Sequence, residues 1–400
     1  MSLFFSVIPV AEAIRILTSG VAPAGDEEIP LEQGLSRILS GAVSSDSDIP
    51  GFTRSVVDGY AVQAADTTGA GDAIPSMLRQ TGAVPMGGVP DRSVAPGECL
   101  YVPTGAVMPP GADAVVMVEH AETAGDLVLI RRPVAPGENI LGRGEDFPRG
   151  GVVLPGGRRL RPQDLGVLAA AGKDRIRVYR RPRVGVISTG NELVPITAIP
   201  SASQVRDVNS TLCAGFLQEH GCLPKAYGIV SDEQDLLRAA LDRALSECDA
   251  VLVSGGSSKD VRDHCAAAIA GGGEVLAHGI ALQPGKPTIL GRMRGKPVIG
   301  LPGHPASAYI VLRALVRPLV GAMSGGLPPE RRVPAVLAQN LPSPRGREDW
   351  VRVRLEGDQA RPVFGKSGLL NTLAASDGVV VVPAEREGME AGEAVEVILW

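Results

Sequence analysis

The chain has 400 residues and a formal net charge of −5, with 44% of its residues hydrophobic and 21% charged. This composition is that of a soluble globular protein, long enough for roughly two to four domains. The acidic balance, without any basic tract, argues against nucleic-acid binding. Five cysteines without a C-x-x-C pair predict reduced thiols, a cytoplasmic location and no zinc site.

The N-terminal segment does not have the features of a signal peptide. The run MSLFFSVIPVAEAIRIL lacks a basic start and contains Pro9 and Glu12 within its apolar part. No uncharged stretch of the sequence approaches the ~18 apolar residues that a membrane span needs. The sequence therefore predicts a protein without a membrane partner.

The pattern of apolar residues changes twice in the first half of the chain. Helical spacing of apolar residues predicts helices at 10–19 and 31–39. From 49 to 151 the chain shows short apolar runs broken by Pro and Gly, which is typical of a separate β-rich module. A further helix is expected at 161–171, because Gly172 is a natural residue to end it. The expected strands of the module include 98–102, 114–118 and 127–131.

From residue 183 onward, apolar strands alternate with helical patterns. This alternation favours parallel strands joined by crossover helices, which is a doubly wound α/β sheet that binds ligands at the carboxyl ends of its strands. Beyond residue 326, short alternating strands predict a small all-β domain. The expected strands of the sheet are 184–187, 226–230, 250–253 and 298–301, with helices ending at 221 and spanning 232–247 and 305–320.

The most informative stretch runs from 250 to 307. The strand at 250–253 opens into the loop SGGSSKDVRD, whose bare backbone N–H groups before a helix suit phosphate or another oxyanion. Two Pro-Gly turns follow, QPGKP with Lys286 and LPGHP with His304, and both point to the same place. Together they predict a site for an anionic small molecule.

Acidic residues recur at strand or turn ends beside glycine. Each alone has an ordinary structural explanation as a turn residue, a helix cap or a dipole partner. Two of these acidic residues, Glu192 and Asp263, however, lie in segments that directly follow strands of the same sheet. Carboxylates beside an oxyanion repel it unless a cation bridges them, so Mg²⁺ is expected. The residues are Asp58, Asp146, Glu192, Asp207, Asp232 and Asp263.

Several cationic side chains have open interpretations. Lys286, Lys259 and Arg262 could add positive charge to the site, or could form a solvated face, the latter more so for Arg262. Prolines on both sides of Lys286 favour a function for it. His304 could orient a substrate, donate to an oxyanion or cap the following helix.

Seven motifs occur in a fixed order along nearly the whole chain, and they resemble the molybdopterin molybdenumtransferases, the MoeA family that includes the E domain of gephyrin. The motifs are IPGFTRSVVDGYAV at 49–62, PTGA at 103–106 with PGADAVV at 110–116, GENI with GED between 137 and 146, STGNEL at 188–193, SGG at 254–256, PGKP at 284–287 and LPGHP at 301–305.

The resemblance implies an enzyme, a molybdopterin molybdotransferase, which inserts molybdate into the dithiolene of adenylylated molybdopterin and releases AMP. It implies a homodimer whose cleft joins the sheet domain of one subunit to the β module of the other. Molybdopterin adenylyltransferase and molybdoenzymes or their chaperones are the implied transient partners. The implied domains are a MoaB/MogA-like sheet domain (1–27 and 182–325), a linking domain (28–48 and 151–181), the β module (49–150) and a small β-barrel-like domain (326–400).

The resemblance also carries residue roles onto matching positions. The functional acidic positions are Asp58, Asp146, Glu192, Asp232 and Asp263, and all but Asp232 are expected Mg²⁺ ligands. The expected substrate contacts are Thr104, Thr189, Gly190, Ser254, Gly255, Gly256, Ser257, Ser258, Lys259, Lys286, Pro302, Gly303, His304 and Ser307.

Three departures from the family pattern leave alternatives open. Lys259-Asp260 replaces the usual Val-Gly after the glycine pair, Gln283 stands where lysine is common, and His304 where asparagine is common. Lys259 could supply the cation that is missing at Gln283. A tungstate-inserting paralogue and a non-catalytic scaffold or cofactor carrier therefore remain alternatives. The related adenylyltransferase shares only the sheet domain, so 49–150 and 326–400 argue against it.

Overall fold

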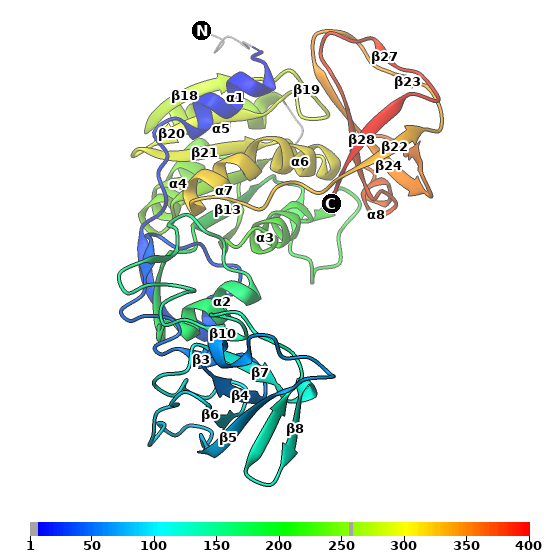
Figure 1. Cartoon of the computed structure of the whole chain (residues 1–400). Coiled ribbons are helices and arrows are strands. Elements are labelled where there is room, and N and C mark those ends of the chain that lie inside the picture. Colours follow the sequence, from blue (N-terminus) through cyan, green and yellow to red (C-terminus); the bar gives the residue numbers. More distant parts are fainter. Residues whose placement is uncertain (1–6, 256–258) are drawn as a thin grey trace. The chain divides into compact units, whose positions relative to one another are not determined.

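The computed structural model describes residues 7–255 and 259–400, without the side chains of 259–263. The chain divides into two compact units (Figure 1), Met1–Glu27 with Val178–Trp400, and Glu28–Arg177. We call these the sheet unit and the module unit. Each is described by itself.

The module unit is built around a mixed six-stranded sheet in the order β7-β4-β6-β5-β9-β8. Only β5 and β6 pair in parallel. Apolar side chains such as Val62, Leu78 and Val116 fill the core beneath it. The strands are β4 (Gly59–Val62), β5 (Ser76–Ala83), β6 (Glu98–Val102), β7 (Ala114–Met117), β8 (Ala121–Ala124) and β9 (Leu127–Ile130). The prediction that this region is rich in β structure is confirmed.

Helix α2 (Pro162–Ala170) lies in the same unit, where the sequence predicts it. Its first turn is held by the buried Asp164, which accepts hydrogen bonds from the Arg161 backbone N–H and from the guanidinium groups of Arg158 and Arg161. Burial opposes ionisation of this carboxyl, but the hydrogen bonds from Arg161 and Arg158 lower its pKa. The helix ends before Gly172, whose φ of 71° is the left-handed conformation expected there.

The predicted helix at 31–39 is wrong. A single 3₁₀ turn, η1 (Leu31–Gln33), ends at Gly34, and Ser36 then adopts a left-handed φ of 64°. Beyond this point Ile38 forms an antiparallel bridge with Arg159. The apolar spacing that suggests a helix instead places Ile38 and Leu39 in the core from an extended segment.

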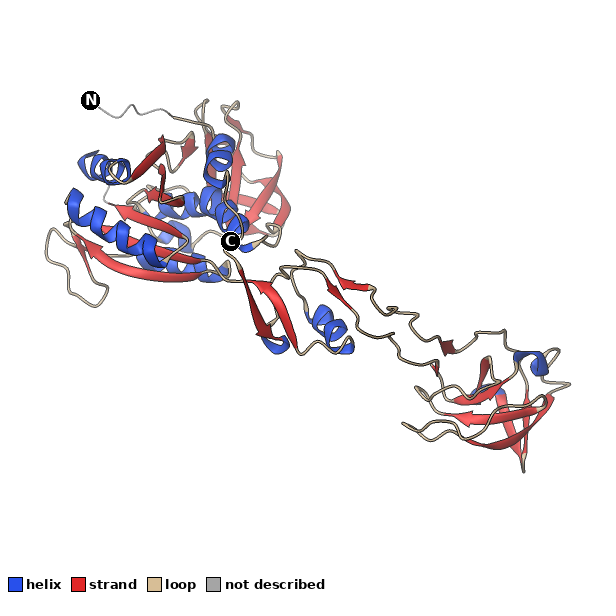
Figure 2. Ribbon diagram, turned by 90° about the vertical axis from the view of Figure 1, so that its left-hand side faces the viewer, coloured by secondary structure: helices blue, strands red, loops and turns tan. Residues whose placement is uncertain are grey.

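The sheet unit contains the expected doubly wound sheet, in the order β16-β13-β17-β21-β20-β18. Its first four strands run parallel, and β20 and β18 add an antiparallel edge. In Figure 2 these strands lie among helices. The strands are β13 (Arg183–Thr189), β16 (Leu223–Val230), β17 (Ala250–Gly255), β18 (Gly273–His278), β20 (Ile289–Met293) and β21 (Lys296–Leu301).

Two apolar cores hold helices against opposite faces of this sheet. One core joins α1, α3, α6 and α7 to residues such as Leu252 and Ile299, and the other joins α4 and α5 to neighbours such as Val251 and Val298. Because a fully parallel strand is covered on both sides, its residues form a continuous apolar run rather than an alternating one. The helices are α1 (Val10–Thr18), α3 (Asn209–Glu219), α4 (Gln234–Glu247), α5 (Lys259–Ala270), α6 (Pro305–Val311) and α7 (Arg317–Ser324).

A π-helical turn, η4 (Leu312–Val316), connects α6 to α7, so that residues 305–324 form one continuous helix. This helix is long and apolar enough to cross a membrane by length and composition, yet 72% of its apolar window is buried. Such burial is expected for the core helix of a globular domain.

The C-terminal strands form a small barrel within the sheet unit. The order is β19-β24-β25-β22-β28-β26, and β26 also pairs with β24, which closes the last five strands on themselves. The short strand β19 (Leu282–Gln283) comes from the sheet domain and pairs with the start of β24. The barrel strands are β22 (Arg332–Leu337), β24 (Glu348–Glu356), β25 (Gln359–Pro362), β26 (Gly378–Val382) and β28 (Ala394–Leu399). The β structure predicted beyond residue 326 is therefore present, with one short helix, α8 (Asn371–Ala374), among its strands.

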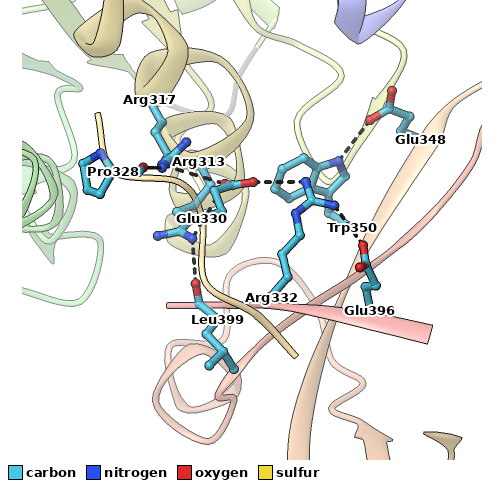
Figure 3. Close-up of polar contacts among 9 residues, drawn as sticks. All are labelled: Arg313, Arg317, Pro328, Glu330, Arg332, Glu348, Trp350, Glu396 and Leu399. Atoms are coloured by element: carbon cyan, nitrogen blue, oxygen red, sulfur yellow. Dashed lines mark hydrogen bonds and ion pairs between the residues drawn. The ribbon is translucent and has the colours of Figure 1, made fainter. Parts of the chain in front are cut away.

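An ion-pair cluster joins the core helix to the barrel (Figure 3). Glu330 lies 3.9 Å from Arg313, 3.8 Å from Arg317 and 3.3 Å from Arg332. The buried Arg313 also donates to the Leu399 carbonyl oxygen at 2.7 Å. Because Arg313 is largely withdrawn from water, these contacts resist screening better than exposed ion pairs do. They fix the barrel where its loops can reach the carboxyl edge of the sheet.

Candidate functional site

Two adjacent pockets lie at the carboxyl edge of the sheet, where a doubly wound fold is expected to bind its ligand. The larger, which we call the sheet-edge pocket, has a volume of about 600 Å³. The smaller, which we call the turn pocket, has a volume of about 300 Å³. Gly303 and His304 line both, so the two pockets share a wall.

The sheet-edge pocket is lined by both polar and apolar residues. Its lining comes from the loop after β13, from the start of α3, from the end of β17 and from the barrel. The residues are Glu192, Leu193, Pro200, Gln204, Val205, Arg206, Asp207, Val208, Asn209, Ser254, Gly255, Gly303, His304, Pro305, Gly368 and Leu370.

Asn209 ties two of the predicted loops together. Its Nδ2 donates to Ser254 Oγ at 2.8 Å and to the Gly303 carbonyl oxygen at 2.9 Å. The side chain is buried, and its Oδ1 has no hydrogen-bond partner. Asn209 therefore fixes the end of β17 against the Pro-Gly-His-Pro turn while leaving one acceptor unused.

Asp207 has a structural role that its sequence context already suggested. Its Oδ2 accepts from Ser188 Oγ at 2.6 Å, and its Oδ1 accepts from the backbone N–H of Ser210 at 3.1 Å. The second contact satisfies a donor in the first turn of α3, as a helix-capping carboxylate does.

Asp232 holds the loop after β13. Its Oδ1 accepts from the buried Thr189 Oγ1 at 2.6 Å, and its Oδ2 accepts from the Asn191 backbone N–H at 3.2 Å. The Asp232 N–H in turn donates to Asn191 Oδ1 at 3.3 Å. This exchange positions Gly190 and the neighbouring Glu192, which lines the sheet-edge pocket.

The turn pocket gathers cationic and hydroxyl side chains from distant segments. Lys286 comes from the Pro-Gly-Lys-Pro turn, Ser307 from the start of α6, and Arg347 and Ser367 from the barrel. In that turn Gly285 has a φ of 142°, and a Cβ there would lie 2.9 Å from Leu282 and Val311. Only glycine fits this position, so the tight turn that presents Lys286 depends on it. The full lining is Leu282, Gln283, Pro284, Gly285, Lys286, Pro287, Pro302, Gly303, His304, Ser307, Arg347 and Ser367.

Two residues of this lining, Arg347 and Ser367, were not predicted from the sequence. Neither belongs to a glycine-rich motif, and both lie in a domain predicted only as β structure. The buried Nε of Arg347 and the buried Oε1 of Gln283 lack hydrogen-bond partners in the turn pocket. Buried polar atoms without partners are uncommon in folded proteins.

The module unit holds three of the predicted site residues. Asp58 Oδ1 accepts from the Thr104 backbone N–H at 2.6 Å and from Thr104 Oγ1 at 2.9 Å. The two Thr104 hydrogen bonds lower the pKa of Asp58 below its usual range, so the carboxyl is ionised. Asp146 lies in a loop anchored by its own N–H, which donates to the Ile49 carbonyl oxygen at 3.1 Å.

The remaining predicted residues fall wholly or partly outside the described part of the chain. Gly256, Ser257 and Ser258 lie outside the described residues, and Lys259 and Asp263 lie in α5 without a described side chain. Within 7–255 and 264–400, no three His, Cys, Asp or Glu side chains come together in a way that could hold a metal ion. Because the predicted ligands are divided between both units and include Asp263, the Mg²⁺ site stays a prediction.

Comparison with known proteins gives the same family along the chain. Residues 8–172 match the MoeA N-terminal region (domain I and II), 185–322 a probable molybdopterin binding domain, and 334–400 the MoeA C-terminal region (domain IV).

Similar proteins cover the chain from end to end. A molybdopterin molybdenumtransferase 2 of Mycobacterium tuberculosis is 34% identical over 97% of this chain and 98% of its own length. A putative molybdopterin biosynthesis protein of Methanocaldococcus jannaschii is 32% identical over the whole of both chains. The crystal structure of a molybdopterin biosynthesis MoeA protein from Pyrococcus horikoshii is 37% identical, with a TM-score of 0.87 over 98% of this chain and 99% of that one. The chain belongs to the MoeA family.

Proposed function

We propose that the protein is a molybdopterin molybdenumtransferase, which inserts molybdate into adenylylated molybdopterin and releases AMP. The observation that carries the proposal is the pair of adjoining pockets: a small one lined by cations and hydroxyls beside a larger one lined by both apolar and polar side chains. A reaction that joins an inorganic oxyanion to an organic ligand needs two such compartments in contact.

The turn pocket suits the oxyanion. Its size is at the lower end of the range for small-molecule sites, which suits a compact tetrahedral ion better than a nucleotide. Lys286 contributes a compact charge, and Arg347 a planar guanidinium that can donate two hydrogen bonds in parallel. The hydroxyl groups of Ser307 and Ser367 lie in the same lining, and Lys286 and Arg347 offer a molybdate ion donors from both the sheet domain and the barrel.

The sheet-edge pocket suits the organic substrate. Leu193, Pro200, Val205 and Leu370 offer apolar surface, and Ser254 offers a hydroxyl at the end of β17. A flat heterocycle needs such a combination, with apolar faces and polar edges. The predicted contacts Gly255, Gly303 and His304 lie in the same lining.

We further propose that a divalent cation such as Mg²⁺ assists the reaction. Carboxylate oxygens are the ligands this hard cation prefers. Asp58 is ionised, and Thr104 engages only its Oδ1, so Oδ2 remains available to a cation. Asp146, Glu192 and Asp263 are the other proposed ligands. The cation would neutralise charge on the phosphate groups of the substrate.

A cytoplasmic homodimer is the proposed assembly, with molybdopterin adenylyltransferase and molybdoenzymes or their chaperones as transient partners. The five buried, unpaired cysteines fit a reducing compartment. In a dimer whose sites combine the two units from different subunits, mixing Asp58→Asn with Asp263→Asn chains should restore part of the activity. Verified mixed dimers without any rescue would contradict shared sites.

The decisive experiment measures AMP release from adenylylated molybdopterin with and without molybdate. The proposal predicts release that requires molybdate and a divalent cation, and that stops in excess chelator. Equal release with tungstate in place of molybdate would favour the tungstate paralogue. Tight binding of the substrate without any release under either oxyanion would favour the scaffold or carrier.

A further inference from the structure

His304 occupies the wall between the two pockets and touches one of the oxyanion-pocket hydroxyls. It lies in the turn between β21 and α6, and its Nδ1 is 2.9 Å from Ser367 Oγ. The Ser367 carbonyl oxygen also accepts from the Ala306 backbone N–H at 3.1 Å. Two hydrogen bonds therefore hold this barrel loop against the turn.

The direction of the His304–Ser367 hydrogen bond decides what Ser367 offers to a ligand. A serine hydroxyl has one hydrogen and two lone pairs. If the neutral ring carries its hydrogen on Nε2, Nδ1 accepts, and Ser367 donates its hydrogen to His304. Ser367 then presents only lone pairs to the turn pocket, which repel an anion. If Nδ1 carries a hydrogen and donates, the Ser367 hydrogen is released to donate to an anion.

We propose that neutral His304 carries its hydrogen on Nε2, and that protonation of its Nδ1 switches Ser367 from an acceptor to a donor toward the turn pocket, so that oxyanion capture is coupled to proton uptake by the protein. The proton goes to the imidazole, which then donates through Nδ1 to Ser367 Oγ. The imidazolium also adds positive charge beside Lys286 and Arg347. This inference rests on the proposed function, because it assumes that the turn pocket receives molybdate.

The charges around His304 explain why the coupling should depend on the ligand. Lys286 and Arg347 line the turn pocket, and both disfavour a third positive charge nearby. On the other side, Glu192, Arg206 and Asp207 line the sheet-edge pocket, where the two carboxylates favour the imidazolium and Arg206 opposes it. Lys366, next to Ser367 in the sequence, adds another cation.

An oxyanion between these cations cancels their repulsion and favours the proton on His304. By linkage, the proton then favours the oxyanion by the same factor. His304 is exposed, so a proton can reach it from solvent.

The test is calorimetric titration of the full-length protein with molybdate alone. Histidine is the side chain that changes charge between about pH 5 and pH 8. We therefore expect molybdate to bind about tenfold more tightly at about pH 6 than at about pH 8, which is ~1.4 kcal/mol. Titrations in buffers of different ionisation enthalpy should show net proton uptake on binding.

Three variants separate the inference from its rivals. His304→Asn should bind molybdate with little pH dependence and without proton uptake. Ser367→Ala should weaken binding mainly at the lower pH, where the hydroxyl is expected to donate. His220→Asn is the matched control, because this histidine lies at the end of α3 away from both pockets and should behave as the parent.

The outcomes distinguish this inference from the proposed function. Binding without proton uptake, or an equal pH dependence in the parent and His304→Asn, overturns the switch while leaving the oxyanion pocket in place. Equal weakening by Ser367→Ala at both pH values overturns the reversal of the hydrogen bond. No binding of molybdate by the parent at either pH overturns the assignment of the turn pocket itself.

Discussion

The two pockets at the carboxyl edge of the sheet differ in how their polar groups are satisfied. Around the sheet-edge pocket, Asp207 and Asn209 are engaged with neighbouring loops, and Asn209 Oδ1 is the only buried atom without a partner among the described side chains there. In the turn pocket, the Nε of Arg347 and the Oε1 of Gln283 are buried without partners. The first arrangement fixes the positions of the loops around its pocket, whereas the second pocket is lined by the charged side chains of Lys286 and Arg347.

This difference predicts different consequences of mutation. Removing a side chain from the turn pocket should weaken ligand binding and leave folding nearly unchanged. Removing one from the network beside the sheet-edge pocket should weaken folding and ligand binding together.

Loss of a cation from the turn pocket should have the largest effect. A hydrogen bond to a charged group contributes ~1.5–3 kcal/mol, so Lys286→Ala or Arg347→Ala should raise the molybdate dissociation constant about ten- to a hundredfold. Titration calorimetry with molybdate measures this directly. Arg345→Ala is the matched control for Arg347, because Arg345 is exposed, pairs with Glu387 and does not line the pocket. Equal effects at Arg345 and Arg347 would show that charge in general, and not this pocket, attracts the ion.

Loss of the network at Asn209 should affect stability instead. Asn209→Ala removes two hydrogen bonds and leaves the buried Ser254 hydroxyl and the Gly303 carbonyl without this donor. We expect the free energy of unfolding to fall by ~1–3 kcal/mol, and AMP release to slow because the two loops are no longer tied. Denaturant unfolding and the AMP assay measure the two effects. Ser254→Ala removes one acceptor only and should cost less; a fully stable Asn209→Ala protein would show that the loops hold without it.

The sequence predicted the sheet-edge pocket well because its parts obey a topological rule. The STGNEL segment, the end of β17 and the Pro-Gly-His-Pro turn each follow a parallel strand, and such strands end at one edge of the sheet. The strand–helix alternation alone therefore predicts that these segments lie close together, and the pattern of apolar residues shows that alternation. The same pattern could not place Arg347 and Ser367 in the turn pocket, because no local sequence motif indicates which part of the sheet domain a barrel loop will contact.

Local conformation explains the one wrong helix and the partly missed network. At 31–39 the apolar period is helical, but Gly34 and the left-handed Ser36 bend the chain before a second turn can form. Asn209 reads in the sequence as an ordinary residue at the start of a helix. Its role depends on contacts with residues 45 and 94 positions away, which no spacing rule reveals.

The smallest expected effect is at Asp58 in the module unit, where the side-chain hydrogen bond from Thr104 helps to lower the pKa of the carboxyl group. Asp58 has a lowered pKa, so its ionised form stabilises the folded protein. This stabilisation is fully present above the ordinary pKa of ~3.9 and is lost as the pH falls through the lowered pKa. Thr104→Val removes the Oγ1 donor but keeps the backbone N–H, so the pKa of Asp58 should rise partway toward its ordinary value. The acid limb of AMP release should then move to higher pH by less than about one unit, since the carboxyl is exposed.

Thr104→Ser is the control for this shift, because it keeps the hydroxyl and should leave the profile of the parent unchanged. A pH–rate profile of the three proteins at saturating molybdate measures the effect apart from the turn pocket. A shift of the acid limb to lower pH in Thr104→Val would have the wrong sign, and would mean that the hydroxyl favours the neutral carboxyl. An unchanged limb would mean that the ionisation of Asp58 does not control the reaction, and that its predicted place among the metal ligands is mistaken.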